Sequence, residues 1–77
     1  MDKEIEQEIQ ALSAQIILEP ENALALYRRG SLYWKLERRA EAITDFNASA
    51  NLDPEGPGAA AAAHAQAILD FFNPQNP

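Results

Sequence analysis

The side chains that most often carry out catalysis or bind metals are scarce in this sequence. It contains a single histidine, His64, and no cysteine, so it offers neither a thiol–imidazole pair nor several histidine ligands. Gly56 and Gly58 flank Pro57 and lack the spacing of a phosphate-binding loop. The sequence therefore favours a protein that is not an enzyme and that holds no cofactor or metal, and we expect His64 to be a partly buried helix residue.

Basic side chains, in contrast, gather in one short segment. The chain carries a formal net charge of −6, yet five of its six Lys and Arg residues are Arg28, Arg29, Lys35, Arg38 and Arg39. An acidic protein lacks the positive surface that binds nucleic acid, but this basic segment could attract an acidic peptide. Tyr27 and Trp34 lie beside these cations, and aromatic and cationic side chains are common anchors of protein interfaces.

Apolar residues recur at intervals of three and four along the chain, which is the spacing of amphipathic helices. Pro20 ends the first such segment, Asn22 is a suitable N-cap for the second, and the Pro- and Gly-rich stretch 53–58 separates the last two. The pattern predicts an all-α fold of about four helices, over 3–18, 23–36, 39–51 and 58–72. We expect one domain over 1–73, with a frayed tail at 74–77.

The helix predicted over 23–36 has apolar residues on two sides, so it should lie between neighbouring helices. The helix over 39–51 should turn Ala42 and Phe46 inward and Asp45 outward. The last helix begins in a run of alanines, which have high helix propensity and allow close approach. Its inward residues should be Ala61, Ala65, Ile68 and Phe72.

A repeat of 34 residues is visible in the chain. Pro20 and Pro54 are 34 residues apart, and each follows a leucine and an acidic residue. Between 23 and 56, the residues Gly30, Tyr33, Ala42, Phe46 and Leu52-Asp53-Pro54 resemble the tetratricopeptide repeat (TPR) family. The resemblance implies one full repeat at 23–56, a preceding half repeat and a C-terminal capping helix. It also implies antiparallel helical hairpins in a short right-handed solenoid fragment.

By this resemblance, the chain is an adaptor that binds a protein or peptide. The first helix of a TPR repeat lines a concave groove, and the corresponding residues here are Leu24, Tyr27, Arg28, Ser31, Trp34 and Lys35. Tyr27 and Trp34 could instead be core residues that pack against the first helix. Arg29 stands where the family prefers leucine; we expect its head group to reach solvent, with an ion pair to Glu41 or Asp45 as the alternative.

Self-association is the competing hypothesis. Repeat units usually need about three copies to bury a continuous core, and this chain holds little more than one. A homodimer through the Ala-rich last helix, with Phe71 and Phe72, would supply the missing neighbour, so the chain is expected to be a monomer or a homodimer. The acidic start of the sequence and its lack of a long apolar run favour a cytoplasmic protein without membrane contact.

Overall fold

The structure, a computed structural model, describes residues 2–72, without the side chain of Phe72. It contains four helices: α1 (Asp2–Leu18), α2 (Ala23–Lys35), α3 (Arg39–Leu52) and α4 (Pro57–Phe72). No strand occurs within the described range. The all-α prediction is confirmed, and every predicted helix boundary falls within one residue of the observed one. The predicted tail, 74–77, lies outside the described residues.

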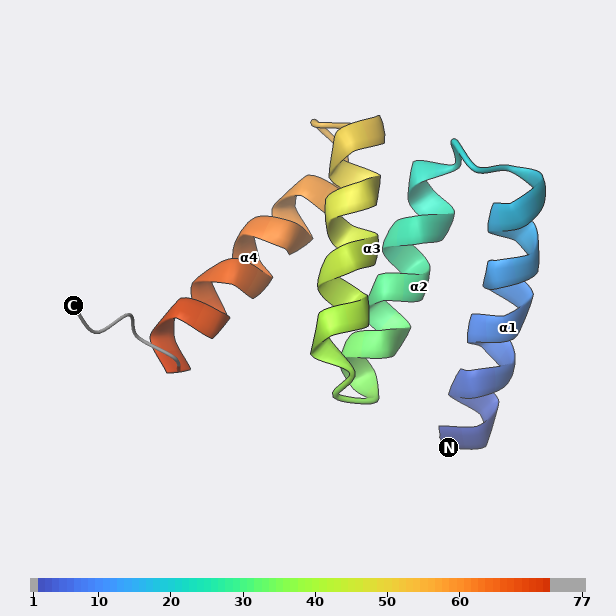
Figure 1. The fold of residues 1–77 in the computed structure, drawn as a ribbon, viewed down its shortest axis with the longest axis horizontal. Coiled ribbons are helices and arrows are strands. Elements are labelled where there is room, and N and C mark those ends of the chain that lie inside the picture. The colour runs from blue at the N-terminus through green and yellow to red at the C-terminus, as the bar shows by residue number, and fades with distance from the viewer. Residues whose placement is uncertain (1, 73–77) are drawn as a thin grey trace.

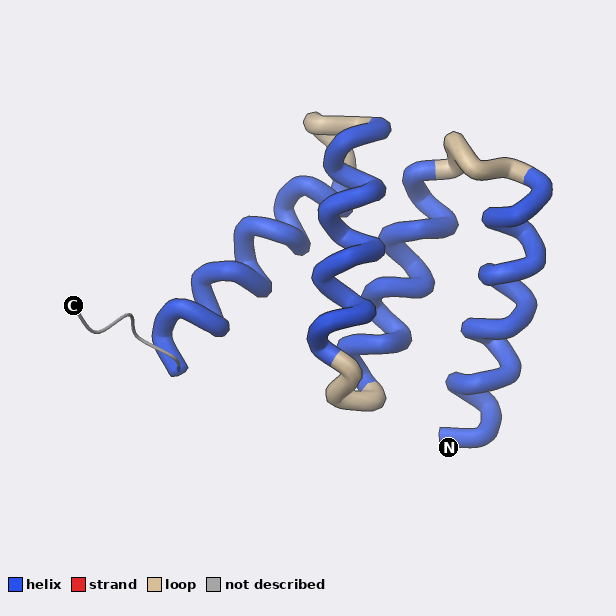
Figure 2. Tube along the Cα trace, viewed as in Figure 1, coloured by secondary structure: helices blue, strands red, loops and turns tan. Residues whose placement is uncertain are grey.

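The helices follow one another across the molecule, with α1 at one end and α4 at the other (Figure 1). Successive helices run up and down, joined by short turns (Figure 2). α2 packs against α1, α3 and α4, as its two apolar sides predict, and α4 packs against α3 and α2. The fold is therefore a single row of helices, whose two end helices are each covered on one side.

Local interactions define where α2 begins and ends. The Asn22 side-chain oxygen accepts a hydrogen bond from the Ala25 N–H at 2.9 Å, which confirms the predicted N-cap. At the other end, the N–H of Glu37 donates to the Trp34 carbonyl and that of Arg38 to the Tyr33 carbonyl, both at 2.9 Å. This paired arrangement is a Schellman motif, and it places Glu37 at a φ of 62°.

The centre of the core lies where α2, α3 and α4 meet. Ala42, Phe46 and Ala65 are buried there, and Ala42 has no exposed surface. A Cβ atom on Gly30 would lie 2.7 Å from Cε1 of Phe46 and 3.1 Å from the Ala42 carbonyl oxygen. Glycine at position 30 therefore lets α2 and α3 approach closely.

The prediction that Arg29 reaches solvent is wrong, and so is the outward placement of Asp45. The side chain of Asp45 is only 5% exposed and that of Arg29 21%. Arg29 donates from Nε and Nη2 to the two carboxylate oxygens of Asp45, at 2.7 and 2.8 Å, and from Nη1 to Ser13 Oγ at 3.0 Å. The pair forms because a charge held among three helices must be matched by an opposite charge.

This network ties α1 to the α2–α3 hairpin, because its three residues come from three different helices. The hydrogen bond to Asp45, together with the attraction of its charge, raises the pKa of Arg29 above the ordinary value for arginine. The Arg29 guanidinium therefore keeps its charge at alkaline pH, and its ion pair with Asp45 persists there.

Candidate functional site

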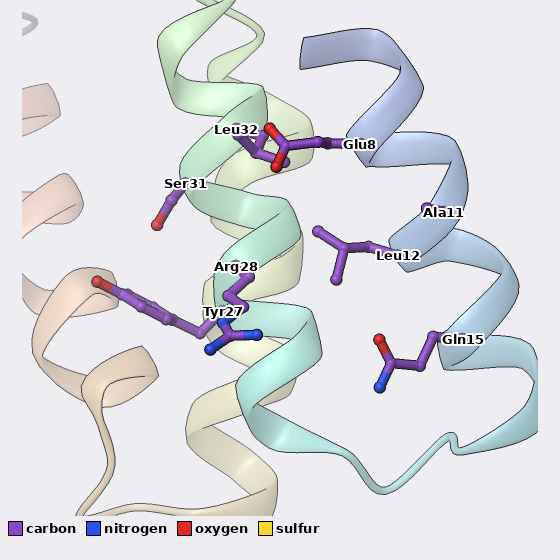
Figure 3. A pocket seen from close by; sticks show the side chains of 8 residues that line it. All are labelled: Glu8, Ala11, Leu12, Gln15, Tyr27, Arg28, Ser31 and Leu32. Atoms are coloured by element: carbon purple, nitrogen blue, oxygen red, sulfur yellow. The ribbon is translucent and has the colours of Figure 1, made fainter. Parts of the chain in front are cut away.

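An open groove of about 490 Å³ runs between α1 and α2 (Figure 3). Each helix contributes four residues to its lining. They are Glu8, Ala11, Leu12 and Gln15 from α1, and Tyr27, Arg28, Ser31 and Leu32 from α2. The groove lies along two antiparallel helices, so it has the shape to hold a third helix or an extended segment lengthwise.

The groove combines an apolar floor with charged edges. Leu12 extends from α1 toward α2, and Leu32 contributes from the facing helix (Figure 3). Glu8 and Arg28, both exposed, add one negative and one positive side chain on opposite sides of the lining. A ligand of this groove would therefore need apolar contact along its length and charges of both signs, rather than a uniformly acidic face.

The six residues predicted to line a binding surface are divided by the structure. Tyr27, Arg28 and Ser31 line the groove between α1 and α2. Ser31, Trp34 and Lys35 line a second hollow of about 240 Å³, whose other side is formed by Phe46 and by Ala61, His64 and Ala65 of α4. Leu24 is 46% exposed and lies outside both linings. Five of the six predicted α2 residues are thus divided between two adjacent hollows, with Ser31 lining both.

Tyr27 and Trp34 contribute mainly to the core. Both pack on the buried cluster of Ala42, Phe46 and Ala65, and their ring centroids lie 6.1 and 6.5 Å from that of Phe46 in α3. The core interpretation, one of the two that the sequence left open, is confirmed for both rings, but their aromatic partner is Phe46 of α3 rather than a residue of the first helix. The reason is that Gly30 brings α2 close to α3, so the aromatic rings on either side of it meet Phe46.

Much of the positive charge near this surface is already matched within the fold. Arg29 pairs with Asp45, and Arg38 forms an ion pair with Glu41 that raises the pKa of Arg38 and lowers that of Glu41. The guanidinium of Arg39 lies 5.2 Å from the centroid of the Trp34 ring, within range of a cation–π interaction. Arg28 is the basic residue that lines the α1–α2 groove.

The contribution of α1 to the groove was missed by sequence reasoning, although the 34-residue offset contains the signal. Adding 34 to the four α1 lining residues gives Ala42, Asp45, Phe46 and Ser49. Those are the buried residues of α3.

These α3 residues contact α2, while Ala42 and Phe46 also pack against Ala65 of α4. Gly30 approaches Ala42 and Phe46, Arg29 pairs with Asp45, and the Ser49 hydroxyl donates to the Ala23 carbonyl at 2.7 Å. The α1 side of the groove is therefore the positional equivalent of the α3 surface on which α2 lies. A helix placed on α1 as α2 is placed on α3 would occupy the groove.

His64 is exposed, so the prediction that it is partly buried is wrong. The face of α4 that packs against the core carries Ala61, Ala62 and Ala65, and His64 lies on the edge of that face.

In the described part of the chain, no three Asp, Glu or His side chains are grouped so that they could hold a metal ion. No helix between residues 2 and 72 has the length and apolar character needed to cross a bilayer. Comparison with protein-family models, with curated proteins and with solved structures found no match.

Proposed function

We propose that this chain is a protein-binding module of the tetratricopeptide type, and that the α1–α2 groove receives a helical segment of a protein partner. The observation that carries the proposal is the equivalence between the groove face of α1 and the α2-binding face of α3. The α3 face is covered by α2 of the same chain. On α1, none of the helices described between residues 2 and 72 occupies that position.

The residues of the groove indicate how the partner helix should differ from α2. Glu8 of α1 is equivalent to Ala42 of α3, which Gly30 approaches within the chain. A partner helix with glycine at the position of Gly30 would leave the Glu8 carboxylate without a matching group. A lysine or arginine on the partner would complement Glu8. On the α2 side, Arg28 favours an acidic residue in the partner, which retains part of the acidic-partner prediction.

A synthetic peptide with the sequence of residues 22–37 tests this proposal, since α2 already has the register that the groove requires. We would prepare it with Gly30→Lys and, as the matched control, with Gly30→Glu. Titration into the ¹⁵N-labelled chain, followed by ¹H–¹⁵N chemical shifts, should show shifts along α1 and the Arg28 side of α2. The Lys peptide should bind at least about tenfold more tightly, because the Glu peptide places like charges together.

A blocking variant identifies the site. Ala11 is exposed on the groove floor, so Ala11→Arg should fill the groove without disturbing the fold. It should abolish the shifts caused by the Lys peptide. Equal binding of the two peptides, or no shifts at millimolar peptide, would overturn the proposal.

A further inference from the structure

The outer face of α4 has an equivalent inside the fold. Subtracting 34 from the numbers of Ala63, His64 and Ala67 gives Arg29, Gly30 and Tyr33 of α2. These three α2 residues are the ones that pair with Asp45, approach Ala42 and pack on the Ala42–Phe46 cluster. His64 and Ala67 are exposed on α4, so this face is open where the equivalent face of α2 covers α3.

The two ends of the molecule thus present the two halves of one kind of interface. α1 offers the equivalent of the α3 surface, and α4 offers the equivalent of the α2 surface that binds it. These helices lie at opposite ends of the row (Figure 1), so one copy cannot join them to each other. We propose that α4 of one copy docks in the α1–α2 groove of a second copy; this inference rests on the proposed function and names the partner helix.

The polar groups at the centre of this contact support a second copy as the occupant. Within the chain, Gly30 and Ala42 meet at the closest approach of α2 and α3. Their equivalents are His64 on α4 and Glu8 on α1, both exposed in the single chain. The imidazole N–H of His64 can donate to the Glu8 carboxylate, so two small residues are replaced by a complementary polar pair.

The contact should be weaker than the α2–α3 interface. Ala67 replaces Tyr33, and Ala63 replaces the paired Arg29, so α4 presents less apolar and ionic contact than α2 does. The longer His64 and Glu8 side chains also prevent the close backbone approach that Gly30 allows. We therefore expect reversible association with a dissociation constant in the range of roughly 10 µM to 1 mM.

The contact is heterologous, because a different surface is used on each copy. Each pair of chains retains one free groove and one free α4 after the first contact, so the mass should increase beyond a dimer as concentration rises. The symmetric dimer through α4, which the sequence suggested, would stop at two copies and would leave Glu8 without a role.

Complementary charge changes test the pairing. We would prepare Glu8→Lys and His64→Glu separately and measure each by sedimentation equilibrium from about 10 µM to 1 mM. His64→Glu alone places two carboxylates together and should associate at least about tenfold more weakly than the wild type. Glu8→Lys alone removes the carboxylate that accepts from His64 and should also weaken association. An equimolar mixture should recover association. In the mixture, the two variants can alternate. The glutamate introduced on α4 of one variant then faces the lysine introduced on α1 of the other. At the next contact, the unchanged His64 faces the unchanged Glu8.

The controls separate this inference from the proposed function. Both positions are exposed, so far-UV circular dichroism should show an unchanged fold for each variant. A wild-type chain that stays at 8.5 kDa throughout overturns the self-docking inference, while peptide binding in the groove would still support the proposed function. Association that is unaffected by Glu8→Lys also overturns the inference, and points to a contact that does not involve the groove.

Discussion

Removal of the Asp45 carboxylate should strongly destabilise this small domain. The substitution Asp45→Ala leaves the Arg29 guanidinium among three helices without its counter-charge. Loss of one partner from a fully buried ion pair costs about 3–5 kcal/mol. Because the Arg29 side chain is 21% exposed and keeps its hydrogen bond to Ser13, we expect a smaller loss, about 2–3 kcal/mol. A chain of this size has roughly 4–12 kcal/mol of stability, so the loss is a large share of the total.

The assay is urea unfolding followed by circular dichroism, with the fluorescence of the single tryptophan, Trp34, as a second probe. The matched control is Glu41→Ala, which removes the carboxylate from the exposed Arg38–Glu41 pair one turn away. Both side chains of that pair are nearly half exposed, so its loss should leave the unfolding midpoint unchanged within error.

The double variant Arg29→Leu, Asp45→Leu tests the reason for the loss. If the cost of Asp45→Ala arises from an unpaired charge, replacing both partners by apolar groups should restore stability to within about 1 kcal/mol of the wild type, or raise it. The reasoning is refuted if Asp45→Ala is no more destabilising than Glu41→Ala. That result would mean that the guanidinium reaches water once its partner is removed.

Three further substitutions test other parts of the fold by the same unfolding assay. Gly30→Ala should lower stability by about 1–2 kcal/mol, since the clash with Phe46 outweighs the gain in helix propensity, and Phe46→Leu should relieve the clash in the double variant. Glu37→Gly should raise stability by about 0.5–1 kcal/mol, because glycine accepts the positive φ at this position without strain; a decrease would contradict the Schellman assignment. Asn22→Ala should lower the free energy of unfolding by about 1 kcal/mol through the lost N-cap, whereas Asn22→Asp should keep most of the N-cap stabilisation.

The helices could be predicted from the sequence because the signals that define them are local. Apolar spacing identifies each helix, and Pro20 and Asn22 mark a boundary by the conformations and hydrogen bonds of their own backbone. The contact of Gly30 with Ala42 and Phe46 was also predictable, although these residues are distant in sequence. That expectation came from the resemblance of these residues to the tetratricopeptide family, and not from a local signal.

The binding surface could be predicted only in part, because a groove belongs to two elements at once. The sequence identified Tyr27, Arg28 and Ser31 on α2, and its 34-residue offset relates Glu8 and Gln15 to Ala42 and Ser49, but it does not show which helix surface those positions face. The packing of α2 on the equivalent α3 surface shows what the α1 positions face, and that packing is a property of the tertiary structure.

Periodicity and capping were sufficient to define the all-α class and the four helices, since these signals act over short distances. Three-dimensional packing was needed to establish the pairing of Arg29 with Asp45, the contacts of Tyr27 and Trp34 with Phe46, and the exposure of His64. Each of these depends on how one helix is rotated and positioned relative to the next. A rotation of a few tens of degrees places the same side chain in the core, in a groove or in water, and that rotation is set by the packing of the whole row of helices.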